Sequence, residues 1–360
     1  ITIGEVVVQE IAARMGAVTG KGTADLIREK FGVRMTAFAM LTLLIANLGT
    51  TFAQFAGIAA AGELFGISKY ITVPLAAIII SALILKGNYK HVEKVLLFLC
   101  LSAFAYVITV FINKPDWGLI AREAIRPRFN LNNEYILAML AVVGTTITPW
   151  GIFYLQASIA DKGIDLQQYD HTKIDVMFGA AWGNVISAFI MITTASTLFL
   201  RGIVVEEAAE AAMALEPLAG QWSSTLFSIG LVGASLLAIS VLPLSTTYAV
   251  CEAFGFERGL NRPVKEAPVF YTMFAIITIL SMAVVLIPGV PLFQLMILSQ
   301  SMNGILLPIL LVLVLILAND NRVMGKWKNK PLTNVLAIAM TVLIFVVTIA
   351  LFAGELFKLG

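Results

Sequence analysis

Long apolar stretches separated by short polar segments run through the whole sequence. A helix needs about 20 apolar residues to cross the hydrocarbon core of a bilayer, and helices satisfy every backbone hydrogen bond there. The pattern therefore predicts an all-α polytopic membrane protein with ten spans, at 1–17, 36–60, 70–85, 92–112, 133–160, 174–200, 221–253, 267–287, 291–318 and 332–353.

Composition agrees with this class of protein. Hydrophobic residues make up 59% of the 360 and charged residues 13%, with a mean hydropathy of +0.92, whereas a soluble chain carries roughly 25% charged residues. A net charge of +2 without a basic, aromatic-studded surface excludes a nucleic-acid partner. Cys100 and Cys251 lie in apolar stretches and are interpreted as small hydrophobic residues.

The distribution of basic residues predicts which connections face the cytoplasm. Of the 24 Lys and Arg residues, 17 fall in five connections, at 14–34, 86–94, 161–173, 257–266 and 319–331. The opposite side includes 201–220, which carries Glu206, Glu207, Glu210 and Glu216 against Arg201 alone. The positive-inside rule places the five connections in the cytoplasm and leaves no Lys or Arg within a span. We expect a multi-pass protein of the cell inner membrane or plasma membrane.

The stretch 133–160 contains the sequence most typical of a broken helix. Pro149 has no N–H and leaves the carbonyl of Thr145 without its helical partner, while Gly144 and Gly151 make unwinding easier. Irregular backbone at membrane depth is tolerated where it lines a cavity, and in transporters such breaks bind substrates or ions. We expect the Thr148 hydroxyl and the Thr145 carbonyl to face such a cavity. A proline kink without a ligand is the alternative that the pattern alone leaves open.

Several segments resemble the NRAMP family of divalent-metal transporters. They are 8–22 (VQEIAARMGAVTGKG), 238–240 (AIS), 250–255 (VCEAFG), 299–300 (SQ), 303–308 (NGILLP) and 319–325 (NDNRVMG). The resemblance implies a LeuT-like fold of two inverted repeats, in which the ten stretches are helices two to eleven. The chain would be one transmembrane transport domain, with a first repeat at 1–112, a second at 133–318 and an extra helix at 332–353. Because Ile1 opens inside an apolar stretch, we expect the first helix, which in this family bears metal ligands, to be missing.

The sequence departs from the usual family pattern at the break. Family members that carry manganese and iron have Met-Pro-His where this chain has Thr148-Pro149-Trp150. Hydroxyl, carbonyl and water oxygens suit Mg²⁺, whereas a thioether suits softer metals. The change resembles the NRAMP-related magnesium transporters. The resemblance also implies that Gln300 offers its amide to the metal or its water, with Asn303 nearby; a hydrogen bond between helices is the alternative.

The segment of this chain that aligns with the family's third helix also departs from the usual family pattern. The family's Asp-x-x-Glu pair, associated with proton transfer, aligns with Thr51 and Gln54, which share a helix face with Asn47. Neither residue titrates near neutral pH. The family histidines align with Trp150 and Leu155, and the two histidines of this chain, His91 and His171, lie in predicted cytoplasmic connections. The sequence therefore predicts no proton relay in the membrane.

Other polar residues have structural interpretations. Ser245, Thr246 and Thr247 follow Pro243 and are expected to satisfy backbone carbonyls, while Glu252 is expected to pair with Arg258 or Arg262. Glu5 and Glu10 are the carboxylates that could lie at membrane depth.

These features predict a divalent metal ion transporter that imports Mg²⁺, and Mn²⁺ too, by alternating access without proton coupling. A proton-coupled Mn²⁺/Fe²⁺ carrier and an organic-solute carrier on the same fold are the alternatives. We find no enzyme motif, and expect no cofactor, since the metal is the cargo. The expected partners are the metal ion and the lipid bilayer, with no obligatory protein partner.

Overall fold

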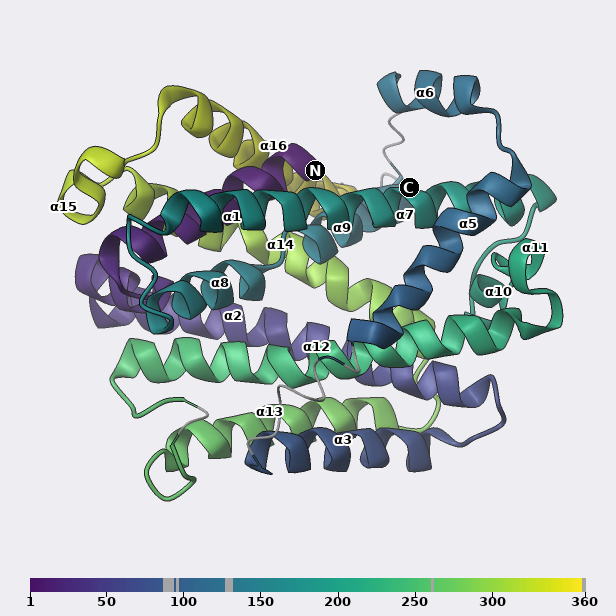
Figure 1. The fold of residues 1–360 in the computed structure, drawn as a ribbon, viewed down its shortest axis with the longest axis horizontal. Helices are drawn as coiled ribbons and strands as arrows, with labels where there is room; N and C mark the ends of the chain where they lie inside the picture. Colours follow the sequence, from purple (N-terminus) through teal and green to yellow (C-terminus); the bar gives the residue numbers. More distant parts are fainter. Residues whose placement is uncertain (87–93, 95–96, 127–131, 260–261, 358–360) are drawn as a thin grey trace.

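The predicted stretches form helices in the computed structural model, which describes residues 1–86, 94, 97–126, 132–259 and 262–357 and has no strand among them (Figure 1). The beginning of the stretch 92–112 and His91 lie outside the described residues. The helices are α1 (Thr2–Thr19), α2 (Thr23–Glu63), α3 (Lys69–Lys86), α5 (Phe104–Asn113), α6 (Trp117–Ile125), α7 (Asn133–Thr146), α8 (Pro149–Asp161), α9 (Tyr169–Thr197), α10 (Ala208–Met213), α11 (Glu216–Ala219), α12 (Ser223–Phe254), α13 (Pro268–Leu286), α14 (Leu292–Ala318), α15 (Asn321–Met324) and α16 (Pro331–Phe357).

Seven helical segments of the described chain are long and apolar enough to cross a membrane. They are Thr23–Glu63, Asn133–Asp161, Tyr169–Arg201, Glu216–Phe254, Pro268–Leu286, Leu292–Ala318 and Pro331–Phe352. An eighth is possible where Leu97–Asn113 meets α6 at a bend of 116°. The stretch 70–85 forms a shorter apolar helix, and the stretch 1–17 forms α1, which carries Glu5, Glu10 and Arg14.

The α2 helix begins earlier than the hydropathy pattern predicts. It includes Thr23–Phe31, which we assigned to a connection, and turns at Gly32, whose φ of 76° and ψ of 176° are not helical. A positive φ is accessible to glycine at little cost. The segment before this turn carries Asp25, Arg28, Glu29 and Lys30, so it is a polar helix that leads into the apolar span.

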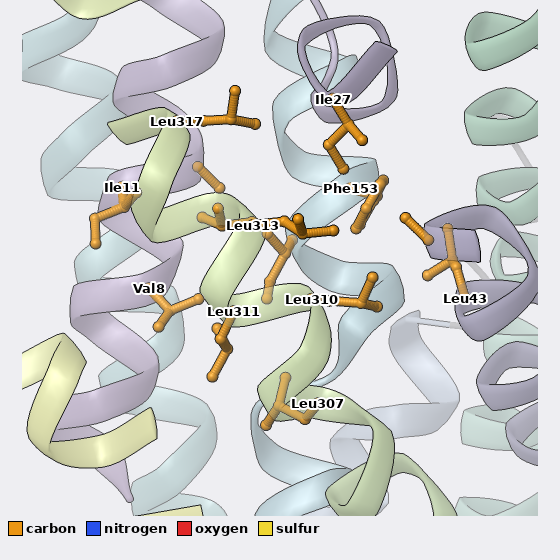
Figure 2. Packing of buried hydrophobic residues seen from close by; sticks show 14 of the residues in the cluster. Val8, Ile11, Ile27, Leu43, Phe153, Leu307, Leu310, Leu311, Leu313 and Leu317 are labelled. Atoms are coloured by element: carbon orange, nitrogen blue, oxygen red, sulfur yellow. The ribbon is translucent and has the colours of Figure 1, made fainter. Parts of the chain in front are cut away.

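The core of the bundle is built around α14. Figure 2 shows α14 leucines packed among side chains from α1, α2 and α8; the labelled residues are Leu307, Leu310, Leu311, Leu313, Leu317, Val8, Ile11, Ile27, Leu43 and Phe153. In the most apolar part of each span, 61% of the α14 residues are buried, against 6% for α9. The α14 helix is therefore a central element and α9 a peripheral one.

Four of the predicted cytoplasmic connections meet at one end of the molecule. The Arg14 guanidinium donates to the Trp327 carbonyl and to Asn329 Oδ1, both at 2.6 Å, and its Nε lies 3.1 Å from Glu10. The Tyr169 hydroxyl donates to Glu10 as well. Contrary to our prediction, Arg14 thus lies within a helix and is only 6% exposed. Its charge is tolerated because a carboxylate and two oxygen acceptors surround it.

The end of α12 joins the same region. Glu252 Oε1 accepts the Gly22 N–H at 3.0 Å and lies 3.2 Å from Arg258 Nη2, which confirms the predicted pairing of Glu252. Arg28 donates to the Ala253 carbonyl at 2.6 Å, and Lys30 pairs with Asp320. These contacts tie the connections to one another, as expected of segments on one side of the membrane.

Candidate metal-binding site

The backbone leaves helical geometry where Pro149 predicts a break. The α7 helix ends at Thr146 and α8 begins at Pro149, and between them Ile147 has φ −100° and ψ 79° and Thr148 has φ −80° and ψ 134°. The break occurs because Pro149 lacks an N–H and restricts the residue before it to extended conformations. Thr145 is exposed and Thr148 is half-buried.

The Thr148 hydroxyl lies beside Gly151 and close to α1. It makes no capping hydrogen bond to α8. A Cβ atom placed on Gly151 would be 2.8 Å from Thr148 Oγ1 and 3.4 Å from Gln9 Nε2, so the α1 amide lies near this hydroxyl. Trp150 is half-buried and its ring packs against Tyr154, 6.4 Å away between centroids. Gln9 was not among the predicted site residues, because its position next to the break depends on how α1 packs on α8.

Gly144 allows α7 to pack closely against α14, and it does not unwind the helix as we predicted. It lies inside α7, and a Cβ atom there would be 2.2 Å from the Gln300 carbonyl oxygen and 2.4 Å from the Gly304 nitrogen. A Cβ on Gly304 would lie 2.3 Å from the Leu140 carbonyl oxygen. The two helices therefore meet backbone to backbone, which only glycine permits. This contact places Gln300 and Asn303 of α14 against the broken helix.

The second half of the broken helix, α8, makes a similarly close contact at a glycine, with α1 as its partner. A Cβ atom on Gly16 of α1 would lie 2.9 Å from the Gln156 carbonyl oxygen and 3.1 Å from Ile159 of α8. The Gln156 side chain accepts a hydrogen bond from the Thr23 hydroxyl at 2.6 Å and donates to the Lys21 carbonyl at 2.9 Å. Thus α7 is held by α14, and α8 is held by α1 and the turn after it.

Side-chain amides of α2 and α14 extend the polar region. Asn303 Nδ2 donates to Thr50 Oγ1 at 2.5 Å and to Gln300 Oε1 at 3.1 Å, and Asn47 Nδ2 donates to Thr246 Oγ1 at 2.6 Å. Both asparagines are fully buried, yet neither Oδ1 atom has a hydrogen-bond partner in the described part of the chain. Buried acceptors are usually satisfied, so these two oxygens are candidates for an ion or for its water.

The polar face predicted for α2 is buried between other helices. Thr51 is buried and its hydroxyl donates to the Asn47 carbonyl at 2.7 Å, while Gln54 is half-buried. Thr50 and Thr246 were not predicted to take part. Thr50 lies three residues after Asn47, so the helical spacing that singled out Asn47 and Thr51 could have identified it.

The acidic, histidine and cysteine residues of the described segments do not form a metal-binding cluster. In the described segments, no group of three or more His, Cys, Asp or Glu side chains could hold a metal ion. Glu5 accepts a hydrogen bond from Asn184 of α9, and His171 is exposed at the beginning of α9. The side chains of Thr148, Asn47, Gln300 and Asn303 themselves offer neutral oxygen atoms to an ion.

A family comparison matches this chain over almost its full length. The model of the natural resistance-associated macrophage protein-like (Nramp) family matches residues 1–354. This chain belongs to the Nramp family. Its curated relatives include the divalent metal cation transporters MntH of Caldanaerobacter subterraneus and of Yersinia pestis, each 26% identical. The alignments cover 91% of this chain in both cases, and 77% and 79% of the relatives.

Solved Nramp structures share the fold. The manganese transporter of Eremococcus coleocola, as a mutant with one histidine replaced by alanine, gives a TM-score of 0.71 at 18% identity over 99% of this chain and 79% of that one. The structure of this transporter in complex with an aromatic bis-isothiourea compound gives a TM-score of 0.72 and covers 98% of this chain and 78% of that one. The predicted all-α, LeuT-like fold is thereby confirmed.

Proposed function

We propose that this Nramp protein is a divalent metal ion transporter that takes up Mg²⁺, and Mn²⁺ too, by alternating access across a cell inner or plasma membrane. The metal is the cargo and passes the break in 133–160. Family membership and the MntH relatives support divalent metal transport. Two inverted repeats, at 1–112 and 133–318, and a further helix at 332–353 would form the transport domain.

The observation that carries the magnesium proposal is the chemistry of the groups at the break. Thr148 has a hydroxyl without a capping role, and the carbonyl of Thr145 in the last turn of α7 would add a second oxygen ligand. The contact of Gly144 with α14 brings Gln300 and Asn303 to the same helix. All of these groups are neutral oxygen ligands, which favour a hard ion that keeps several of its waters.

The residues at the positions that resemble the family's proton path support transport without proton coupling. A carrier that moves a proton with the metal needs a group inside the membrane that gains and loses charge near ambient pH. Thr51, Gln54, Trp150 and Leu155 occupy the positions that resemble the family's proton path, and none of them titrates there.

Proton-coupled manganese transport is the second candidate. The observation that favours it is the set of relatives, which includes MntH proteins and, among solved structures, manganese transporters. The two candidates differ in the expected competition between ions, because a site of neutral oxygens accepts Mg²⁺ whereas a thioether site discriminates against it.

Competition in proteoliposomes tests the proposal. The full-length protein is reconstituted and Mn²⁺ uptake is measured with and without a roughly hundredfold excess of Mg²⁺, which would displace almost all Mn²⁺ from a shared site that binds the two ions with similar affinity. We expect uptake to fall steeply. Thr148→Met should restore uptake in the presence of Mg²⁺, whereas the control Thr194→Met, on peripheral α9, should behave as the parent. Mn²⁺ uptake by the parent that ignores Mg²⁺ would refute the proposed magnesium site.

A further inference from the structure

A hollow of about 430 Å³ lies between α1, α9 and α16, away from the broken helix. One part of its wall is apolar and consists of Val6, Val7, Met177, Leu332 and Leu336. The other part is basic and includes four lysines, Lys173, Lys326, Lys328 and Lys330. The hollow therefore offers two chemically distinct surfaces to one occupant.

The positive charge of the basic wall is largely uncompensated. None of the four lysines forms an ion pair with a carboxylate among the described residues, and Lys326 lies over the Trp327 ring, 5.9 Å from its centroid. Two carboxylates, Glu10 and Asp170, also line the hollow. Glu10 is already engaged by Arg14 and Tyr169. The ammonium groups are thus available to an anion.

The apolar wall lies deeper in the membrane than the basic wall. Met177 follows Lys173 by four residues along α9, which is about 6 Å towards the bilayer centre at the rise of an α-helix. Leu332 and Leu336 likewise follow Lys330 into the apolar span of α16. The lysines belong to connections that the positive-inside rule places in the cytoplasm. The hollow thus runs from the cytoplasmic interface into the hydrocarbon region.

We propose that this hollow binds an anionic phospholipid of the cytoplasmic leaflet. The phosphate would lie among Lys173, Lys328 and Lys330, and an acyl chain would cover Met177, Leu332 and Leu336. Basic hollows between membrane helices on the cytoplasmic side are suited to lipid headgroups. A free anion would satisfy only the lysines and leave the apolar wall uncovered. The peripheral position of α9 leaves this wall accessible to lipid.

Lipid titration monitored by native mass spectrometry tests this assignment. The full-length protein is titrated in detergent with phosphatidylglycerol, with phosphatidylcholine of the same acyl chains, and with glycerol phosphate, whose phosphate is at least as negatively charged as the headgroup and which has no chains. We expect phosphatidylglycerol to bind much more tightly than either. Each lysine near a phosphate contributes about fivefold, so Lys173→Gln/Lys328→Gln/Lys330→Gln should weaken binding on the order of 100-fold.

A matched control removes the same charge elsewhere. Lys94, Lys162 and Lys265 also belong to predicted cytoplasmic connections but do not line the hollow, so their triple replacement by Gln should leave phosphatidylglycerol binding within about threefold of the parent. Both variants should keep the parent's melting temperature, since the replaced lysines are not buried. Equal loss in the two variants, equal binding of phosphatidylcholine, or equal binding of glycerol phosphate would overturn the proposal. The readout is lipid binding, so it is independent of which metal is transported.

Discussion

The backbones of α7 and α14 are in contact at Gly144, so even a methyl group added at this position should destabilise the protein strongly. In Gly144→Ala the new methyl group would lie 2.2 Å from the Gln300 carbonyl oxygen, and ordinary contact begins at 3.4 Å. The helices would have to separate by about 1.2 Å, and the obstructing atoms are backbone atoms, which cannot rotate away. Overpacking of this kind costs typically 1–3 kcal/mol, and we expect about 3 kcal/mol here.

A glycine without neighbours provides the matched control for Gly144→Ala. Gly183 lies within α9, and a Cβ atom there would meet nothing within 4 Å, so Gly183→Ala should be neutral or should stabilise the helix by about 0.5–1 kcal/mol. The assay is thermal unfolding of the purified full-length protein in detergent. We expect Gly144→Ala to lower the apparent melting temperature by about 5 °C and Gly183→Ala not to lower it. If Gly144→Ala has the same melting temperature as the parent, the contact between α7 and α14 is not as close as the structure indicates.

Three further predictions concern the proposed ion site and the end of the molecule where the predicted cytoplasmic connections meet. Thr148→Ala should weaken competition by Mg²⁺ without lowering the melting temperature, because the hydroxyl has no capping role, and unchanged competition would exclude it as a ligand. Metal influx should not acidify proteoliposomes loaded with a pH-sensitive dye; metal-dependent acidification at clamped membrane potential would restore the proton-coupled mechanism. Hydrogen bonds from Lys30 and from the Arg322 N–H lower the pKa of Asp320, so its stabilising effect is present above the unfolded-state pKa and is lost as pH falls through the lower folded-state value. Asp320→Asn should therefore have a lower melting temperature than the parent at neutral pH, and this difference should shrink as the pH falls below the ordinary pKa of a carboxyl group. A difference that stays constant with pH would contradict this linkage.

The sequence is sufficient to predict features that depend on local chemistry. The apolar stretches predict the helices because the bilayer requires them, and Pro149 predicts the break because its effect on the backbone is local. The pairing of Glu252 with Arg258 involves residues six positions apart, so charge and proximity suggest it.

Features that depend on distant segments were predicted less well. Gly144 was interpreted as a point of unwinding, whereas its role depends on Gly304 of α14, which no local pattern connects to it. The burial of Arg14 depends on Trp327 and Asn329, more than 300 residues further along the chain. The partner of Asn303 is Thr50, and the packing of α2 on α14 decides this pairing.

The two glycine contacts on the broken helix have a mechanical consequence. Gly144 holds α7 to α14, and Gly16 holds α8 to α1, so the two halves of the helix make these close backbone contacts with different helices. Only Ile147 and Thr148 connect the halves with non-helical backbone. A rotation of one half against the other would change mainly the dihedral angles of these two residues. Thr148 is also one of the proposed ion ligands, so an ion bound there together with the Thr145 carbonyl of α7 would link the two halves and restrict their movement.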